Sequence, residues 1–577
     1  MTRRLLFVTV FAFAGILVLG AQSRRPSALA QRRAFTVVEA AIPTLRGALE
    51  QRRTTSRGIV TEYLTRIATY EDKLHAALAV NPHALEEADE RDRGRAAGRA
   101  RGPLYGIPIA LKDNIHTTDL PTTGGALAFS GFVPPYEATI TKNLRDAGAI
   151  IIAKTGMTEL ANWVAGPPTP MPANYNAIGG FGFNPYDPRR DPRPAADGRP
   201  ALPTGGSSSG IGTAANLWTA NVGTETSGSI LSPANQNMLA AVKPTVGRIS
   251  RYGVIPITAD QDTPGPMAKT VTDAAILLGA LESAVPDPND PATRLCTPPP
   301  GRDYTRFLKA GGLKGARIGI PRAFFDERGS LSAPVSGPAA RGSLNPDQAG
   351  VVADAIGVLK REGAVIVDPA DIPSVVDRDP KSRYSLWSAC SGADNGKGRD
   401  ADCSVTFKYG MKRDFNNWLA SLGPSAPVTS LAELRAWNTA HGAAGALKYG
   451  QSNLDISDEM DLENDRARYE ADRAKDIRLS ATHGIDEVMK AERLDAILFP
   501  GSSGAAIAAA PGYPTVIVPF GWIPNAPAPA FPEGFDARPQ PYGVSFTGTA
   551  CSEPRLIELA YAFEQATKRR VPPAGAP

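Results

Sequence analysis

Apolar residues recur at helical spacing near the start of the chain. Between residues 35 and 101 they recur every three or four positions, which is the pattern of amphipathic helices. The clearest positions are Ile59, Tyr63, Leu64, Ile67, Leu74 and Leu78. We therefore expect this first stretch to be helical.

Short uninterrupted apolar runs follow, and such runs are typical of buried strands. Residues 104–112 and 150–154 are two of them, with a helical pattern at 139–147 between them. Strand, helix and strand in this order predict a β-α-β unit. Further strands are predicted at 316–320, 496–499 and 515–519, and a last helix at 553–568.

Two long segments lack the pattern of core elements. Residues 165–204 are rich in proline, glycine and asparagine, which predicts a long loop at the mouth of a site. Residues 326–490 are polar, charged and helical, and the charges at 461–478 indicate a solvated face. Five side chains in or beside the loop fit either an apolar substrate group or ordinary core packing: Trp163, Met171, Phe181, Phe183 and Tyr186.

Composition narrows the class of protein. The 577 residues are 42% hydrophobic and 21% charged, which is typical of a globular protein and leaves room for one large α/β enzyme core. The 62 basic and 58 acidic residues give a net charge of +4 without a dominant basic block. We therefore expect no nucleic acid as the main partner.

The amino terminus has the pattern of an export signal. Arg3 and Arg4 precede an apolar run at 5–20, and small residues follow as far as Ala30. This run is shorter than the roughly 20 residues that span a bilayer comfortably. We expect a signal peptide at 1–30, a single domain at 31–577, and a periplasmic or secreted protein without stable membrane contact. An uncleaved membrane anchor is the alternative.

Export would allow the four cysteines to form disulfide bonds, because disulfides form outside the cytoplasm. Cys390 and Cys403 flank a short polar stretch and either close a disulfide loop or remain unpaired thiols. Nothing local pairs Cys296 with Cys551. The spacings of common metal sites are absent from the sequence, so we expect neither a metal nor a cofactor.

Two serine-glycine clusters carry the chemistry. They read G-G-S-S-S-G at 205–210 and G-T-E-T-S-G-S-I at 223–230. Glycines let several backbone N–H groups converge on one point, which suits a phosphate or the oxyanion of a tetrahedral intermediate. Upstream, Lys112 ends an apolar run, and a lysine in apolar surroundings loses its proton more easily. Together these features indicate a serine hydrolase that needs no histidine.

The order of these motifs resembles that of the amidase signature family. G-I-P-I-A-L-K-D-N at 106–114 precedes both serine clusters, and Q-D-T-P-G-P-M at 261–267 and Y-P-T-V-I-V-P at 513–519 follow them. Within the family the chain is most similar to bacterial peptide amidases. The resemblance implies a mixed central sheet covered by helices. It also implies a core at 35–325 and 491–577 and a variable, substrate-facing helical insert at 326–490.

Carried over residue by residue, the resemblance implies a Ser-Ser-Lys relay. Lys112 matches the catalytic lysine, Ser207 the bridging serine after a cis peptide bond, and Ser229 the nucleophile. The backbone N–H groups of the residues up to the nucleophile match the oxyanion hole: Thr226, Ser227, Gly228 and Ser229.

The sequence departs from the family pattern in two places. Ser207 and Ser229 stand 22 residues apart, fewer than is typical, with the loss falling early in the helix after the first cluster. Ser208 is therefore a second candidate for the bridging role. Ser227 also replaces a commoner glycine.

These residues predict an exported serine amidase that cleaves carboxamide C–N bonds through an acyl-enzyme, with peptide C-terminal amides among its substrates. The partner would be a small-molecule or peptide amide, and no oligomeric state follows from the sequence. One alternative is a Ser-His-Asp esterase with Ser208 as nucleophile and His441 or His483 as base. Another is a catalytically inactive binding protein on the same fold. The export signal argues against the cytoplasmic tRNA-amidation branch of the family.

Overall fold

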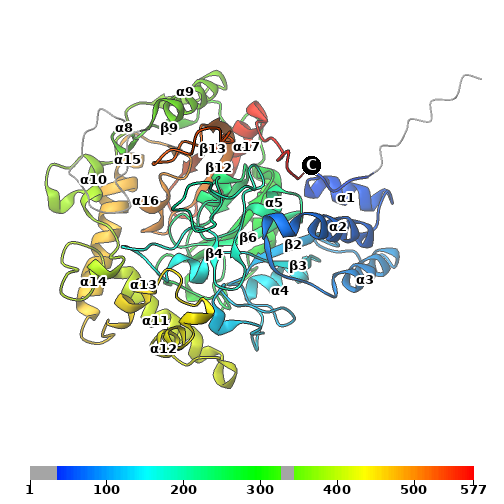
Figure 1. Ribbon diagram of the computed structural model, residues 1–577. Coiled ribbons are helices and arrows are strands. Elements are labelled where there is room, and N and C mark those ends of the chain that lie inside the picture. Colours follow the sequence, from blue (N-terminus) through cyan, green and yellow to red (C-terminus); the bar gives the residue numbers. More distant parts are fainter. Residues whose placement is uncertain (1–34, 326–343, 577) are drawn as a thin grey trace, which may run out of the picture. The chain divides into compact units, whose positions relative to one another are not determined.

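A mixed sheet of eleven strands forms the centre of the part described by the computed structural model, residues 35–325 and 344–576. The strands follow the order β1-β3-β2-β6-β8-β7-β12-β13-β11-β9-β10 (Figure 1). Their bounds are β1 Ala77–Val80, β2 Pro108–Lys112, β3 Ile150–Thr155, β6 Ala220–Glu225, β7 Ala240–Lys243, β8 Thr263–Ala268, β9 Arg317–Gly319, β10 Val365–Val367, β11 Ala496–Pro500, β12 Thr515–Ile523 and β13 Gln540–Thr547. The β2–β3, β2–β6, β9–β11 and β9–β10 pairs are parallel, and the other pairs are antiparallel. The predicted α/β class with a mixed sheet is confirmed.

The β-α-β unit predicted near the start of the sheet is present. β2 and β3 are parallel neighbours joined through helix α4 (Thr139–Asp146), and every residue of both strands is buried. Continuous apolar sequence suits strands that are covered on both faces. The first stretch is helical as expected, in α1 (Ile42–Glu50), α2 (Ser56–Leu74) and α3 (Ala84–Ala96). It also contains β1, which the helical spacing did not predict.

Besides β1, five strands of the sheet were not predicted: β6, β7, β8, β10 and β13. The sequences of β6 and β8 lack a strand pattern. β6 reads A-N-V-G-T-E and was interpreted only as a glycine-rich loop. β8 reads T-P-G-P-M-A, and proline is normally depleted in strands because it cannot donate to the ladder. Both are fully buried between neighbouring strands, and β7 and β13 complete the same antiparallel region.

Helices from the middle and from the C-terminal part of the chain pack on this sheet. α7 (Val271–Leu281) packs on β7 and β8, and α17 (Glu553–Thr567) packs on β12 and β13. α9 (Pro346–Arg361) also packs on β12 and β13, although it falls within the range expected to form the cover, as does strand β10. Residues 346–367 therefore contribute one strand to the central sheet and one helix that packs on it.

Of the other helices of the 326–490 range, α11–α14 lie together on one side of the molecule, and α10 and α15 lie closer to β9 (Figure 1). Their bounds are α10 Pro373–Val376, α11 Thr406–Ser421, α12 Leu431–Ala440, α13 Ser452–Asp458, α14 Arg466–Ile477 and α15 Asp486–Ala491. A continuous aromatic cluster joins α11 to the long loop: Phe415 and Trp418 pack with Phe129, Trp163 and Phe181. Met171 and Phe183 belong to the same cluster, so four of the five apolar side chains noted near the loop are core residues.

The fifth, Tyr186, also has a structural role. Its hydroxyl donates to the carbonyl oxygen of Val571 at 2.6 Å, and its ring packs edge-on against Trp522. These contacts tie the long loop to the C-terminal segment rather than lining a substrate site.

All four cysteines are paired. Cys390 and Cys403 form the local disulfide that the sequence left open. Cys296 and Cys551, 255 residues apart, form a second disulfide between the segment after α7 and the loop before α17. Only the fold brings this second pair together.

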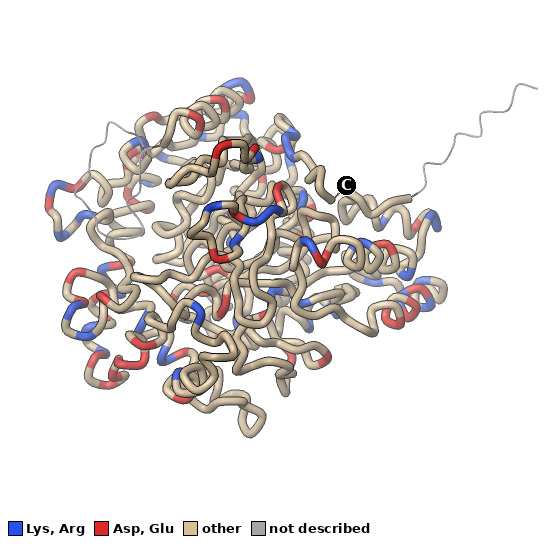
Figure 2. The backbone as a smooth tube through the Cα atoms, in the orientation of Figure 1, with Lys and Arg blue, Asp and Glu red and all other residues tan. Residues whose placement is uncertain are grey.

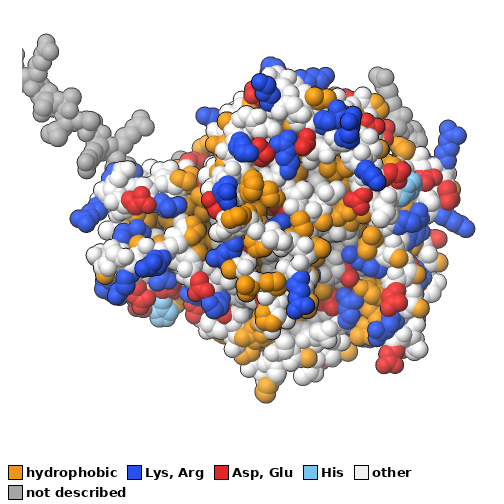
Figure 3. Space-filling view, turned by 180° about the vertical axis from the view of Figure 1, so that it is seen from behind, with side chains coloured by type: hydrophobic (Ala, Val, Ile, Leu, Met, Phe, Trp, Pro, Cys, Tyr) orange, Lys and Arg blue, Asp and Glu red, His pale blue; other side chains and the backbone are white. Residues whose placement is uncertain are grey.

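The distribution of charge fits the composition. Charged residues lie mostly on the outer helices and loops, and the central strands carry few (Figure 2). Figure 3 shows side chains of both signs interspersed over one face, without a continuous basic area. None of the described helices has the length and apolar character needed to cross a membrane. The signal peptide expected at 1–30 lies outside the described residues.

Candidate active site

The candidate site forms where two parallel strands end at the same edge of the sheet. Lys112 is the last residue of β2, and β6 runs beside it into the second serine-glycine cluster. The first cluster lies against this loop, because the Ser208 N–H donates to the carbonyl oxygen of Ser229 at 3.1 Å. A Cβ at Gly206 would lie 2.9 Å from the Cα of Ser229, so this close approach requires glycine.

Lys112 is fully buried and contacts the first cluster directly. Its Nζ lies 2.8 Å from the Ser207 hydroxyl oxygen, 2.9 Å from Thr224 Oγ1 and 3.2 Å from the Thr224 carbonyl oxygen. Burial lowers the pKa of Lys112 to about 7, although the nearby carboxylates of Asp262 and Glu225 partly oppose this effect. A substantial fraction of this lysine is therefore neutral near pH 7 and able to accept a proton.

Asp113, the neighbour of Lys112 in the sequence, does not pair with it. Asp113 instead pairs with Lys154 at 3.2 Å, and both side chains are buried. Asp113 also accepts hydrogen bonds from the backbone N–H and the hydroxyl of Thr123. Within the described part of the chain, no carboxylate lies within ion-pair distance of Lys112.

The second cluster is folded into a tight loop by Glu225. One carboxylate oxygen of Glu225 accepts hydrogen bonds from the backbone N–H groups of Ile230 at 2.7 Å and Leu231 at 2.9 Å. Gly228 has a φ of +97°, which glycine adopts without strain. The loop is therefore held at both ends around a conformation that needs this glycine.

Three consecutive backbone N–H groups of the second cluster are available to a ligand. Among the residues described, the N–H groups of Ser227, Gly228 and Ser229 donate to no protein acceptor. Thr226 is fixed beside them, since its hydroxyl donates to Asp262 and its carbonyl oxygen accepts from Gln261 Nε2 at 3.1 Å. Converging N–H groups on a fixed loop can stabilise an oxyanion.

Ser229 belongs to this loop, but its hydroxyl is not hydrogen-bonded to Ser207 and so is not connected to Lys112. Its side chain is partly exposed, and no hydrogen bond between the Ser229 and Ser207 hydroxyls exists among the described residues. The contact from Lys112 to Ser207 is thus formed, and the contact from Ser207 to Ser229 is open in this structure. Hydrogen bonds of catalytic serines are often long or open without a ligand.

The peptide bond before Ser207 differs from the expectation. The cis bonds of the described residues are Pro167–Pro168, Asp368–Pro369 and Ala528–Pro529, so the Gly206–Ser207 bond is trans. A trans bond is the low-energy form for a residue that is not proline. The Ser207 hydroxyl reaches Lys112 from this conformation. Helix α5 (Ile211–Ala214), which follows the first cluster, has only four residues.

Ser208 has a different environment from Ser207. Its hydroxyl donates to the Thr224 carbonyl oxygen at 3.0 Å and accepts from the Thr224 N–H at 3.1 Å. Both partners are main-chain groups of β6, so Ser208 ties the first cluster to the sheet. It makes no contact with Lys112, and the structure therefore favours Ser207 over Ser208 for the bridging position.

The histidines required by the esterase alternative lie elsewhere. His441 stacks on Trp437 and contacts its carbonyl oxygen, and His483 pairs with Asp377 at 2.7 Å. His116 is buried and contacts Trp418 Nε1, and burial lowers its pKa to about 3. No histidine of the described chain contacts Ser207, Ser208 or Ser229, so a Ser-His-Asp triad is absent there.

Sequence reasoning missed two residues of the site. Thr224 holds both Lys112 and Ser208, and Asp262 holds Thr226. Both stand inside quoted motifs, but only the pairing of β6 with β2 and β8 shows what they contact. Burial raises the pKa of Asp262 to about 7.

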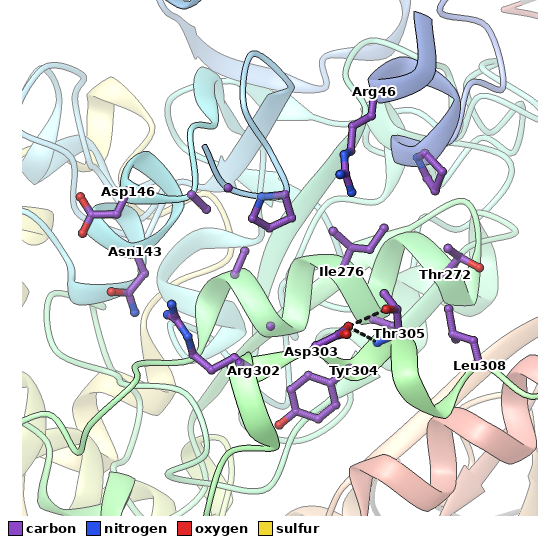
Figure 4. A pocket seen from close by; sticks show the side chains of 18 of the residues that line it. Arg46, Asn143, Asp146, Thr272, Ile276, Arg302, Asp303, Tyr304, Thr305 and Leu308 are labelled. Carbon is purple, nitrogen blue, oxygen red and sulfur yellow. Dashed lines mark hydrogen bonds between the residues drawn. The ribbon is translucent and has the colours of Figure 1, made fainter. Parts of the chain in front are cut away.

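A separate pocket lies on another part of the protein, away from Lys112 and the serine clusters. A cavity of 780 Å³ is bounded by Arg46 of α1, Asn143 of α4, Ile276 of α7 and the segment 301–305 (Figure 4). Residues 102–103 and Ala147, which also line it, precede β2 and β3, so it opens at the amino edge of the parallel strands. Lys112 and the serine clusters lie at the opposite, carboxyl edge.

The chain is similar to known amidases over most of its length. A family model described as Amidase matches residues 58–557. A probable amidase of Arabidopsis thaliana is 33% identical over 544 residues, which cover 93% of this chain and 92% of that protein.

Solved structures give the same result. The native peptide amidase of Stenotrophomonas maltophilia superposes with a TM-score of 0.74 and 34% identity, covering 93% of this chain and 98% of that one. The peptide amidase PAM in complex with the competitive inhibitor chymostatin gives a TM-score of 0.75 and 35% identity, covering 93% and 100%.

Proposed function

This chain belongs to the amidase signature family and is an amidohydrolase acting on C–N bonds, and we propose that it works through a relay of Lys112, Ser207 and Ser229. The observation that carries the proposal is the 2.8 Å contact between Lys112 Nζ and the Ser207 hydroxyl. Since burial lowers the pKa of Lys112 to about 7, its neutral amine can take the Ser207 proton.

The reaction follows from these positions. Ser207 passes its proton to Lys112 and takes the proton of Ser229, whose oxygen attacks the amide carbonyl carbon. Reversal of the relay protonates the leaving nitrogen, which departs as ammonia or an amine and leaves an acyl-enzyme on Ser229. Water, deprotonated by the same relay, then hydrolyses the ester. The relay requires the Ser229 hydroxyl to turn toward Ser207 when substrate is bound.

The second cluster supplies the charge stabilisation. The N–H groups of Thr226, Ser227 and Gly228, with that of Ser229, would point at the developing oxyanion. Removal of one such donor costs about 10²–10³ in rate in hydrolases. The carboxylate of Glu225, which binds the N–H groups of Ile230 and Leu231, keeps the loop in the shape this role needs.

For the substrate we propose small peptide-like carboxamides, with peptide C-terminal amides first. The support is the likeness to a peptide amidase and to its complex with chymostatin. A screen of peptide amides, aryl amides and long-chain acyl amides with purified protein tests this choice. Preferential cleavage of long-chain acyl amides would refute it.

For the location we propose export, with residues 1–30 as the signal and a periplasmic or secreted product. The support is the Arg3-Arg4 and apolar pattern of the sequence together with two disulfides, which persist in oxidising compartments. A retained amino-terminal anchor would place the same catalytic domain at a membrane surface.

The nucleophile provides the direct test. A fluorophosphonate probe should label wild-type protein at Ser229, and peptide mapping should recover the label on the segment that contains residues 223–230. Ser229→Ala should lose both labelling and amide hydrolysis while its melting temperature stays near that of the wild type. Label recovered on Ser208, or full activity of Ser229→Ala, would overturn the relay.

A further inference from the structure

A small cavity opens beside the second serine cluster. It has a volume of about 120 Å³ and is bounded on the core side by Ser227 and Gln261. Ser227 stands two residues before Ser229, so the Cα atoms of this wall residue and of the predicted nucleophile are at most about 7 Å apart. Three segments of the helical cover and the region of α16 (Ala505–Ala509) form the rest of its wall. The lining residues are Tyr384, Trp387, Ser388, Ala389, Ser404, Phe407, Asp476, Leu479, Ser480, Ala506 and Ala510.

The loop and α16 are in contact, which fixes the position of the cavity. A Cβ built on Gly228 would lie 3.6 Å from the Cβ of Ala505, at ordinary van der Waals distance. Arg473 of α14 fixes the cover side, since it donates to the carbonyl oxygens of Ala510 and Asp260. The cavity is therefore a defined space between the catalytic loop and the cover.

The polar side of the cavity is organised around Asp476. One carboxylate oxygen accepts from Trp387 Nε1 at 2.8 Å, and the other accepts from Ser404 at 2.8 Å and Thr406 at 2.7 Å. A carboxylate has about four acceptor positions, so three donors leave capacity for one more. A second carboxylate brought into the same cavity would be repelled.

A second polar group of the wall has no partner. Ser480 is 1% exposed and lines the cavity, and its hydroxyl makes no hydrogen bond within the described residues. A buried hydroxyl without a partner costs free energy, and a ligand that supplies the missing hydrogen bond recovers it. Leu479 and Phe407 make the neighbouring wall apolar.

We propose that this cavity is the acyl-side specificity pocket of the enzyme. It takes the side chain next to the scissile carboxamide, accepts uncharged side chains up to about the size of leucine, favours those with a hydroxyl or amide, and rejects carboxylates. The proposal rests on the proposed function, because a primary amide releases only ammonia and needs a pocket on its acyl side alone. The size limit follows from the volume, since a cavity of about 150 Å³ in another protein binds benzene.

The first experiment measures kcat/KM of the purified protein on N-acetylated amino-acid amides. Leucine and threonine amides should exceed glycine amide by about tenfold or more, the range typical of a filled pocket. Threonine amide should exceed the isosteric valine amide, and aspartate amide should fall at least about tenfold below asparagine amide. Equal rates for glycine, leucine and tryptophan amides would overturn the pocket.

The second experiment fills the cavity. Ser480→Leu should lower kcat/KM for leucine amide at least about tenfold and leave glycine amide nearly unchanged. Ser385→Leu is the matched control, because the Ser385 hydroxyl also lacks a partner in the described part but does not line the cavity. If Ser480→Leu fails to fold, Ala510→Val fills the same space from the other wall.

The third experiment removes the charge. Asp476→Asn should reduce the discrimination between asparagine and aspartate amides, with the melting temperature recorded beside the rates. A uniform loss across all amides, or unchanged selectivity in well-folded variants, overturns the pocket while leaving the amidase relay intact. Absence of any amide hydrolysis together with absence of labelling at Ser229 instead overturns the proposed function, and the pocket with it.

Discussion

The Nζ of Lys112 lies 2.8 Å from the hydroxyl oxygen of Ser207, inside the protein and without a carboxylate partner in the described chain. A buried lysine of this kind is costly as a cation, so its surroundings favour the neutral amine. In the proposed relay this contact lets the lysine act as the base, and no histidine of the described residues contacts the three serines.

Removal of the amine should affect amides more than activated esters. In Lys112→Ala, amide hydrolysis should fall by about 10³ or more, because general acid–base help is worth about 10²–10⁴ and the vacated space disturbs Ser207. A p-nitrophenyl ester should lose less, since its leaving group departs without a proton. Parallel kcat/KM values on a matched amide and ester measure this. An equal loss on both substrates would speak against proton delivery by Lys112.

The pH profile should report the same amine. Because the base must be unprotonated and its pKa is about 7, kcat/KM for an uncharged amide should rise with pH through about 7 and then level off. The Asp262 carboxylate raises the pKa of Lys112, so Asp262→Asn should shift this rise to lower pH. Asparagine can keep the local contacts, because its oxygen can accept from the N–H groups of Ile257 and Thr258 while its NH2 group donates to the hydroxyl of Thr226. A shift to higher pH would identify another group as the base.

Ser207 and Ser208 should differ in what their loss costs. Ser207→Ala should abolish most activity with little change in stability, because its hydroxyl contacts the amine of Lys112, the proposed base. Ser208→Ala should destabilise the fold by about 1–3 kcal/mol, since it removes the acceptor of the buried Thr224 N–H and one of the two donors to the Thr224 carbonyl oxygen. Denaturant unfolding and amide assays on both variants measure the contrast. Reversed effects would assign the bridging role to Ser208.

The sequence predicted those parts of the fold whose local pattern matches their environment. β2, β3 and β11 are buried on both faces and read as apolar runs, and α17 reads as a helix. β6 and β8 could not be predicted in this way, because a glycine-rich and a proline-containing segment become strands only by pairing with neighbouring strands. Tertiary pairing overrides local propensity there.

The candidate site, like the fold, could be predicted only in part from the sequence. Lys112, Ser207 and Ser229 were predicted from motif order, and the structure brings the first two into contact. The roles of Thr224 and Asp262 depend on strand pairing and could not be read from spacing. The pairing of Cys296 with Cys551 is likewise a property of the fold, since 255 residues separate them.

The histidines outside the site should be dispensable. His441→Ala and His483→Ala combined should retain most amide hydrolysis, because both rings lie in the helical cover and, within the described residues, bond to Trp437, Asp377 and Glu487 rather than to the serines. A modest loss of stability is expected from the two ion pairs of His483. A well-folded but inactive double variant would revive a histidine-dependent mechanism.

Export and disulfide formation should be visible on one sample of the natural protein. We expect the mature chain to begin between Gln22 and Arg32, and unreduced peptide mapping to recover Cys390 linked to Cys403 and Cys296 linked to Cys551. In the chain-entropy account a link that closes a long loop stabilises more, so Cys296→Ser with Cys551→Ser should cost about 2–5 kcal/mol. The Cys390→Ser and Cys403→Ser pair is the short-loop control and should cost less. Cytosolic protein that retains Met1 and four free thiols would contradict the proposed location, and with it the argument against a role in tRNA amidation.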